Sequence, residues 1–330
     1  MRVTLFIALP AALAISSLAA AADIAQGDTI VVTATRTPIP LSDVAVPVAV
    51  ITREDIELSL STDLAELLRF QAGIDIGRNG GPGQATSVFL RGTESNHTLV
   101  LIDGVRMNPS TIGGAAVQNI APETIERVEI VKGARSALYG TDAIGGVVNV
   151  ITRRADERHI EGGVGVGSFA TQSWRLSGGN RGIDSEFGFN LNSQNTDGYA
   201  PRIDSNIERG YENLSANVYG LKRFGTTEVS VRHWRAEGNA EYLDFLLNPV
   251  DQDFENAVTS IALESRLSDE GVSKLMLSLA KDEIGQNQAP DFVKSERLGL
   301  DWQYSHAFEN NTVTGGLYVV DESASSLSFG

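Results

Sequence analysis

The chain has 330 residues, a net charge of −16 at pH 7 and no cysteine. The acidic balance argues against nucleic acid as a partner, because proteins that bind DNA or RNA present a basic surface. The lack of cysteine excludes a small disulfide-stapled scaffold, and in an exported chain it is typical of a bacterial envelope protein.

The first 22 residues have the pattern of a secretory signal peptide. Arg2 is followed by an apolar run over residues 3–14, and small residues then lead to an Ala-x-Ala site at residues 20–22. This order predicts export and cleavage near Asp23. The alternative is a membrane-spanning helix, which needs about 20 predominantly apolar residues, whereas this apolar run is shorter.

The stretch DTIVVTATR, residues 28–36, would then lie almost at the new N-terminus. Residues 30–33 of this stretch are all β-branched, which favours an extended strand. A strand near a chain end can offer its main-chain groups to a strand of a partner protein. The alternative is that it pairs within its own domain.

Residues 42–154 alternate short apolar strands with helix signals, which predicts a compact α+β domain. The predicted strands are VPVAVI (46–51), TSVFLR (86–91), TLVLID (98–103), RVEIVK (127–132) and GGVVNVIT (145–152). Thr52 and Asp55 form a capping-box pattern, and Leu64, Leu67 and Leu68 form one face of a helix that is expected to end before Gly73. Two further short helices are expected to start at Pro122 and near Ala134.

After Glu157 the sequence alternates with a period of two, which predicts strands with one apolar and one polar face. SEFGFNLNS (185–193), SKLMLSLAK (273–281) and ERLGLDWQYSH (296–306) show this alternation. About nine such segments are present, and each fits the roughly 9 to 11 residues of a tilted membrane-spanning strand.

Two features favour a membrane barrel over a soluble β-sandwich, whose strands also alternate. Aromatic residues lie toward the ends of segments, where an interfacial girdle is found; they are Trp234, Trp302 and Tyr304. Connections also alternate between short, at residues 224–226, and long, at 196–210 and 236–256. Short turns on one side and long loops on the other are typical of an outer-membrane barrel.

The sequence lacks the motifs of common enzyme classes, so we expect no enzymatic activity. It contains no His-Glu-x-x-His motif, Gly-x-Ser-x-Gly elbow or Gly-x-x-x-x-Gly-Lys phosphate loop, and no cofactor is expected. Two glycine-rich loops stand out, NGGPGQ (79–84) and RMNPSTIGGAA (106–116). They are either ordinary turns or adaptable loops that bring backbone amides against a ligand.

Several stretches together carry a resemblance to a known family. They are DTIVVTATR, SVFLRGTESNHTLVLIDGVRMN and IERVEIVKGARSALYGTDAIGGVVNVITRR, followed by the alternating remainder. The chain resembles the TonB-dependent outer-membrane receptors, densely over residues 28–154 and in pattern beyond them. Within that family, NGGPGQ before FLRG and DAIGGVVN at the domain end are most similar to the cobalamin receptors.

The resemblance implies a plug domain, residues 42–154, followed by residues 155–330 as the first strands, about nine, of a 22-stranded antiparallel transmembrane β-barrel. Residues 1–22 would be the signal peptide, and 23–41 the TonB-box segment and linker. The implied location is the outer membrane of a Gram-negative bacterium, in contact with its lipid. The implied function is TonB-dependent import of a scarce, bulky nutrient, with cobalamin or a related corrinoid as the first candidate. The alternatives are an iron-siderophore or haem receptor of this family and, in a different class, an exported soluble β-protein.

The resemblance also implies three sets of site residues. TonB, with its inner-membrane motor complex, would bind Asp28, Thr29, Ile30, Val31, Val32, Thr33 and Ala34. The ligand would contact Asn79, Gly80, Gly81, Pro82, Gly83, Gln84, Arg106, Met107 and Asn108. Structural calcium in the barrel loops would be held by Asp204, Glu208, Asp244, Asp251 and Asp253, since clustered carboxylates suit a hard cation. Because Ala200 stands where a carboxylate is expected, a solvated acidic loop is the alternative to a calcium site.

The number of predicted strands is small for a barrel that encloses a domain. A barrel of about eight strands is already filled by its own side chains, whereas a plug of this size needs the lumen of roughly 22 strands. We therefore expect the sequence to be C-terminally incomplete, with further strands after Gly330.

Overall fold

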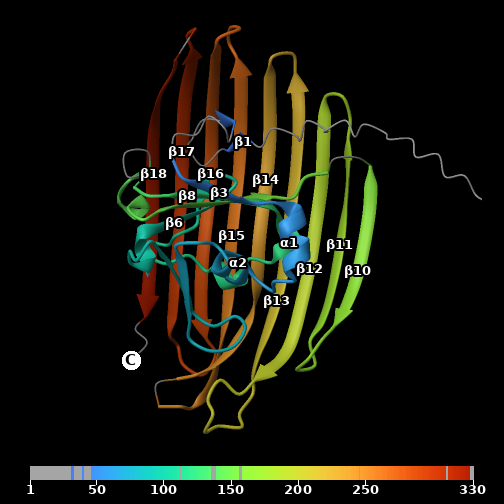
Figure 1. Cartoon of the computed structure of the whole chain (residues 1–330), viewed down its shortest axis with the longest axis vertical. Helices are drawn as coiled ribbons and strands as arrows, with labels where there is room; N and C mark the ends of the chain where they lie inside the picture. The colour runs from blue at the N-terminus through green and yellow to red at the C-terminus, as the bar shows by residue number, and fades with distance from the viewer. Residues whose placement is uncertain are drawn as a thin grey trace, which may run out of the picture. The chain divides into compact units, whose positions relative to one another are not determined.

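The computed structural model describes residues 31–32, 39–40, 46–111, 113–134, 139–155, 158–244, 246–309 and 311–327. Residues 46–155, here called the N-terminal domain, form a small α+β unit, and the residues that follow form a sheet of nine long strands (Figure 1). The predicted signal peptide and most of DTIVVTATR lie outside the described residues. No described helix is both long enough and apolar enough to cross a membrane.

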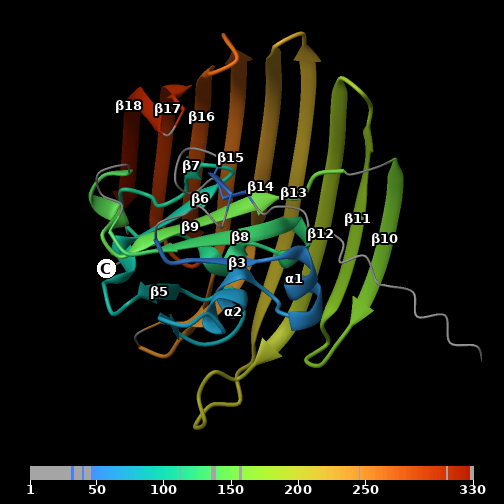
Figure 2. The same cartoon turned by 45° about the horizontal axis from the view of Figure 1, so that its top comes forward.

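The N-terminal domain is built on a five-stranded sheet with the order β3–β8–β9–β6–β7 (Figure 2). Its strands are β3 (Val48–Ile51), β6 (Thr98–Ile102), β7 (Val105–Arg106), β8 (Ile125–Lys132) and β9 (Gly146–Thr152). Strands β6 and β9 run parallel, and the other neighbours are antiparallel. A separate hairpin joins β4 (Ile74–Arg78) to β5 (Thr86–Leu90). The five predicted strands are confirmed as β3, β5, β6, β8 and β9.

Short helices connect these strands. They are α1 (Arg53–Ser59), α2 (Leu64–Arg69) and the 3-10 turns η2 (Ser95–His97), η3 (Val117–Asn119), η4 (Pro122–Thr124) and η5 (Thr141–Ala143). The capping box at Thr52 and Asp55 is confirmed by reciprocal hydrogen bonds between each side chain and the other residue's backbone N–H.

The helix predicted to end before Gly73 is confirmed as α2, which buries Leu64, Leu67 and Leu68, whereas the capping box belongs to a separate helix, α1. Leu60 adopts the left-handed conformation and ends α1, and Asp63 then caps α2. The helix predicted at Pro122 is a single 3-10 turn. Most of the helix predicted after Ala134 lies outside the described residues.

Nine antiparallel strands follow, each paired with its neighbours in chain order. They are β10 (His159–Val166), β11 (Gln172–Arg181), β12 (Ser185–Tyr199), β13 (Arg209–Phe224), β14 (Thr227–Leu243), β15 (Pro249–Arg266), β16 (Gly271–Gln286), β17 (Phe292–Ala307) and β18 (Thr312–Leu327). Within the described ranges β10 and β18 each have one partner strand, so this long sheet is open. The predicted number of strands is confirmed, whereas a total of 22 stays a prediction.

The long strands extend further than the sequence pattern predicted. Strand β12 has 15 residues and β15 has 18, compared with the roughly 9 to 11 that a tilted span requires. The long connection predicted at residues 236–256 is therefore wrong, because β14 and β15 continue into it and leave only residues 244–248 between them. The short turn predicted at residues 224–226 is confirmed, with Gly225 in the left-handed region.

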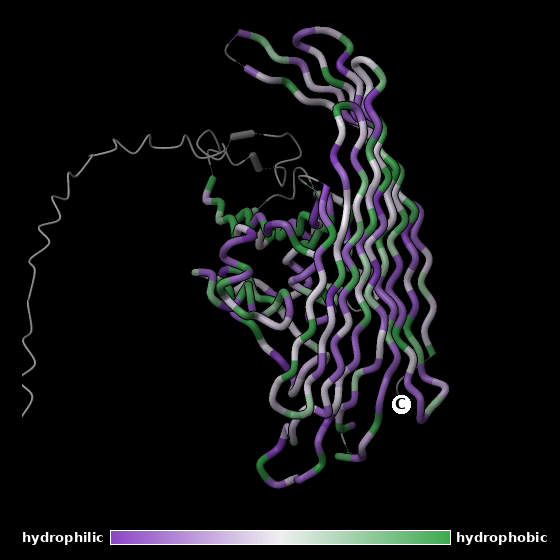
Figure 3. The backbone as a smooth tube through the Cα atoms, turned by 90° about the vertical axis from the view of Figure 1, so that its right-hand side faces the viewer, coloured by the Kyte–Doolittle hydropathy of each residue, from purple (hydrophilic) through white to green (hydrophobic). Residues whose placement is uncertain are grey.

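Burial alternates along the long strands, and Figure 3 shows the matching alternation of polar and apolar residues. In β12, Glu186 and Asn190 are buried, whereas Phe187 between them is 57% exposed. Exposed apolar residues continue across the sheet, as at Ile261 and Leu298. Polar side chains on the covered face and apolar ones on the free face are the reverse of a soluble sandwich and match a membrane barrel.

The N-terminal domain packs directly against the covered face of the long sheet. Its core includes fully buried Leu64, Leu68 and Ile120. The same hydrophobic cluster continues into Trp234 of β14 and Phe254 of β15. This shared core fixes the loops of the domain against particular strands.

Candidate functional site

The first predicted ligand loop, residues 79–84, is the hairpin turn between β4 and β5, and it rests on the long sheet. The buried side chain of Gln84 donates a hydrogen bond to the backbone carbonyl of Glu241, at 3.1 Å. Gly83 has a φ of +72°, and a Cβ atom added there would lie 2.0 Å from the ring of Tyr211. Asn79 on the same loop is exposed. The loop is thus held at one end and open to solvent at the other.

The glycines of this loop differ in their surroundings. A Cβ atom at Gly81 would have 3.9 Å to its nearest neighbours, whereas one at Gly80 would meet the side chain of Gln84 at 2.2 Å. Of these three glycines, only Gly83 is placed so that an added Cβ atom would overlap an aromatic ring of the long sheet, that of Tyr211. A side chain at Gly83 would therefore collide with Tyr211 on β13 of the long sheet.

We expect Gly83→Ala to lower the free energy of unfolding by about 2 kcal/mol, because the new methyl group overlaps the Tyr211 ring and the backbone is left-handed. The measurement is chemical unfolding of the purified full-length protein, with limited proteolysis of the N-terminal domain as a second readout. Gly81→Ala is the matched control and should unfold like the wild type. Equal stability of the two variants would contradict this account of Gly83.

The second predicted ligand loop begins with side chains that are engaged inside the protein. Arg106 forms an ion pair with Asp142 at 2.7 Å, and Met107 is buried. Asn108 is 1% exposed and accepts a hydrogen bond from the backbone N–H of Val100 at 2.7 Å. These contacts hold the loop in place. Ligand contact by these three residues stays a prediction.

The N-terminal segment is described at Val31 and Val32, which form β1. They pair antiparallel with Pro40 and Ile39 of β2 (Ile39–Pro40). A ladder of two residue pairs contains few main-chain hydrogen bonds. The other five predicted TonB-binding residues lie outside the described residues; they are Asp28, Thr29, Ile30, Thr33 and Ala34.

The predicted calcium ligands are dispersed in local contacts. The guanidinium of Arg202 donates to Asp204 and lowers the pKa of that carboxyl group. The side-chain amide of Asn248 likewise lowers the pKa of Asp244.

Asp251 and Asp253 lie closer together, because both accept hydrogen bonds from the side-chain amide of Asn239, at 2.8 Å each. Glu208 is exposed. Across the part of the chain that the structure describes, no three or more acidic or histidine side chains are grouped to hold a metal ion. Calcium binding stays a prediction.

Polar contacts between the N-terminal domain and the long sheet were not predicted from the sequence. Arg232 of β14 forms an ion pair with Asp103 at 3.1 Å. Asn119 donates to Asn256 at 2.8 Å, and Asn256 in turn donates to Asp282 at 2.7 Å. The partners are more than a hundred residues apart in the first two contacts, so no local pattern reveals them.

The end of the N-terminal domain is tied to three strands. Arg154 forms an ion pair with the buried carboxylate of Glu186 on β12, at 2.7 Å. The backbone N–H of Ala155 donates to the hydroxyl group of Tyr219 on β13. On β11, Gly179 lets Ala155 approach, since a Cβ atom there would lie 2.4 Å from that of Ala155. The junction between the two parts is therefore fixed by specific contacts.

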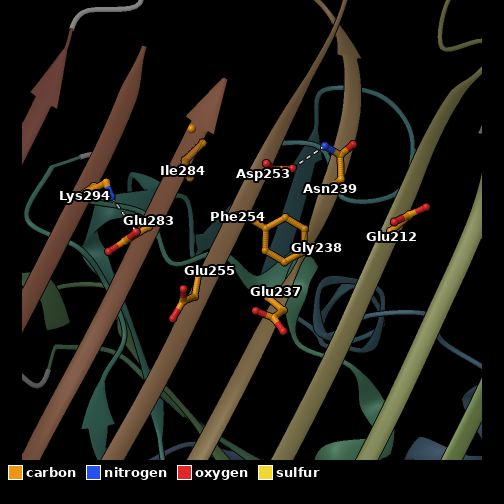
Figure 4. Close-up of a pocket in the computed structure, with 11 residues that line it drawn as sticks. Glu212, Glu237, Gly238, Asn239, Asp253, Phe254, Glu255, Glu283, Ile284 and Lys294 are labelled. Atoms are coloured by element: carbon orange, nitrogen blue, oxygen red, sulfur yellow. Dashed lines mark hydrogen bonds and ion pairs between the residues drawn. The ribbon is translucent and has the colours of Figure 1, made fainter. Parts of the chain in front are cut away.

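A hollow of about 510 Å³ lies over strands β13–β17. Figure 4 shows its charged side chains, including the Glu283–Lys294 ion pair at 3.1 Å and the Asn239–Asp253 hydrogen bond. Its charged residues alternate along their strands with residues such as Tyr211 and Asn256, which contact the N-terminal domain. The charged side of this hollow therefore faces away from that domain.

Comparisons with known proteins agree with this architecture. Residues 40–147 match the family model of the TonB-dependent Receptor Plug Domain. Over 326 residues the chain is 32% identical to the Vitamin B12 transporter BtuB of Photobacterium profundum, and the match covers 96% of this chain and 53% of that protein. The chain thus spans about half the length of this curated relative.

Solved structures share the fold at low sequence identity. The iron transporter FrpB of Neisseria meningitidis has a TM-score of 0.72 at 15% identity, covering 86% of this chain and 49% of that one. The ferric-catecholate import receptor Fiu of E. coli K12 has a TM-score of 0.71 at 14% identity, covering 88% and 51%. At these identities the likeness shows the fold alone.

A compact domain packed on the polar face of an antiparallel sheet, whose other face is apolar, defines a plugged membrane barrel. Residues 40–147 match the TonB-dependent receptor plug family, as the resemblance predicted: the N-terminal domain is a plug domain, and the long sheet has the architecture of part of a barrel wall.

Proposed function

We propose that this receptor imports cobalamin or a related corrinoid across the outer membrane of a Gram-negative bacterium by TonB-dependent transport. The observation that carries the proposal is the similarity to a Vitamin B12 transporter along 96% of the chain. The open side of loop 79–84 supports it, because backbone groups of a glycine-rich loop can approach a bulky ligand closely.

The proposed mechanism consists of recognition and mechanical coupling, without making or breaking a covalent bond. A ligand bound at the plug loops would shift the plug and release residues 28–34 to TonB, which would add a strand to them. The two-pair ladder between β1 and β2 offers little resistance to such an exchange. The inner-membrane motor of TonB would then pull on β3, an edge strand paired with β8 through four residues.

The location and the domain limits belong to the same proposal. Residues 1–22 would direct export, 23–41 would carry the TonB box, and the plug and barrel would divide at residues 154 and 155. The exposed apolar side chains of the long sheet would contact outer-membrane lipid. Calcium would bind through Asp251 and Asp253, near the start of β15, which share a hydrogen-bond partner.

An iron-siderophore or haem receptor is the second candidate within the family. It is favoured by the solved structures of similar fold, which include the siderophore receptor PirA of Acinetobacter baumannii at 21% identity and a TM-score of 0.67, covering 83% of this chain and 48% of that one. Identity at this level leaves the ligand open, so the cobalamin proposal rests on the more similar transporter.

A titration of the purified full-length protein distinguishes these candidates. We expect saturable binding of cyanocobalamin and no saturable binding of ferric siderophores or haem. Binding of a siderophore or haem alone would overturn the corrinoid proposal. Cell fractionation tests the class of protein, because an exported soluble β-protein would separate from the outer membrane.

A further inference from the structure

Strand β12 contains a β-bulge close to its end. Thr196 pairs with Tyr211 and Tyr199 pairs with Arg209, so the bulge adds one residue to β12. An extra residue reverses which side chains face each side of a sheet. Before the bulge, odd-numbered residues such as Phe187 face outward; after it, Tyr199 faces the plug instead.

Glycine is required for this bulge. Gly198 has a φ of +67°, and a Cβ atom at this position would lie 1.8 Å from the carbonyl oxygen of Arg209. No other residue fits between the two strands without moving one of them. The inward position of Tyr199 is therefore set by the backbone.

The neighbouring turn between β10 and β11 is strained. Phe169 and Ala170 both have left-handed backbones, with φ of 58° and 53°. Such conformations are uncommon outside glycine, and strain of this kind is found at functional sites.

Contacts with β12 hold this turn in place. The carbonyl oxygen of Phe169 accepts hydrogen bonds from the backbone N–H of Asp197 at 3.0 Å and from the hydroxyl group of Thr196 at 3.1 Å. The rings of Phe169 and Tyr199 lie 5.4 Å apart, tilted by 50°. We call these two rings the aromatic pair.

The aromatic pair lies beside the glycine-rich loop of the plug. The Tyr199 ring is 3.9 Å from the position that a Cβ atom of Gly81 would occupy. Phe169 remains 55% exposed and Tyr199 40% exposed. An interfacial aromatic girdle would place Tyr199 on the outward face, and the bulge turns it away from that face.

We propose that the aromatic pair is a ligand-contact surface, which packs against a flat apolar part of the transported molecule beside residues 79–84. This inference rests on the proposed function and extends it to residues of the barrel. Rigid aromatic rings supply a large contact area, and their geometry favours planar partners. The bulge and the strained turn would fix both rings before the ligand arrives.

The test compares variants of the full-length receptor by titration with cyanocobalamin. Tyr199→Ala and Phe169→Ala should each weaken binding about tenfold, the equivalent of one lost aromatic contact. Tyr199→Phe keeps the ring and should bind like the wild type. Phe187→Ala removes an exposed ring from the outward face and is the matched control.

The outcomes separate this inference from the proposed function. If both alanine variants bind cobalamin with wild-type affinity, the aromatic pair is not a ligand-contact surface, and the proposed function is unaffected. If the wild-type receptor binds a ferric siderophore instead, the same variants are compared with that ligand and decide the inference in the same way. If it binds none of these ligands, both proposals fail. If Tyr199→Ala does not assemble, Phe169→Ala decides.

Discussion

The substitution Val32→Pro is expected to abolish TonB-dependent uptake while leaving ligand binding unchanged. Val32 lies in β1, at the centre of residues 30–33. Proline removes a main-chain donor and restricts the preceding residue, so it disrupts a ladder formed by strand addition. The proposed ligand loops belong to other parts of the chain, which should keep their affinity.

The control is Val32→Ile, which retains the backbone donor and the β-propensity and should transport normally. Binding and uptake of labelled cobalamin are measured for both variants in cells that supply TonB. Uptake by Val32→Pro at the wild-type rate would refute the coupling role of this strand. Loss of binding in the same variant would show that β1 and β2 are a structural part of the plug.

Removal of Arg232 is expected to produce the largest loss of plug stability. The Asp103 side chain is 7% exposed and pairs with Arg232 at 3.1 Å. Arg232→Met leaves this carboxylate buried without its cation, which should lower the free energy of unfolding of the plug by about 3 kcal/mol. The hydroxyl group of Thr152 still donates to Asp103, at 2.7 Å, and should limit the loss.

A double-mutant cycle isolates this ion pair. Asp103→Asn combined with Arg232→Met removes both charges and should recover part of the stability lost in Arg232→Met alone. Hydrogen exchange of β6 and β9 in the purified full-length receptor measures the effect, since Asp103 follows β6 and Thr152 ends β9. Equal protection in Arg232→Met and wild type would show that the pair contributes nothing to plug docking.

The elements with strong periodicity could be predicted from the sequence. Strand β8 consists only of β-branched and charged residues, and in the long strands apolar and polar residues alternate with a period of two. Strand β4 was missed because IDIGR is short and carries a glycine and two charges. The ends of β14 and β15 were taken for a loop because polar residues such as Glu237 and Asn239 occupy their outward face there.

The candidate site was predictable only as far as its loops. The sequence indicated the glycines of residues 79–84, but not that Gly83 meets Tyr211, which is distant in the chain. Asn108 was expected at the ligand surface, and its burial depends on contacts with Val100 that no motif reveals. The inward orientation of Tyr199 has one local sequence signal, Gly198. This glycine can be recognised as part of a β-bulge only when the pairing of β12 with β13 is known.

The most direct test of the central claim is the uptake of labelled cobalamin by cells that produce the full-length receptor, with and without TonB. The account predicts binding at the cell surface in both strains and accumulation inside only when TonB is present. Accumulation that does not depend on TonB, or the lack of cobalamin binding in either strain, would contradict it.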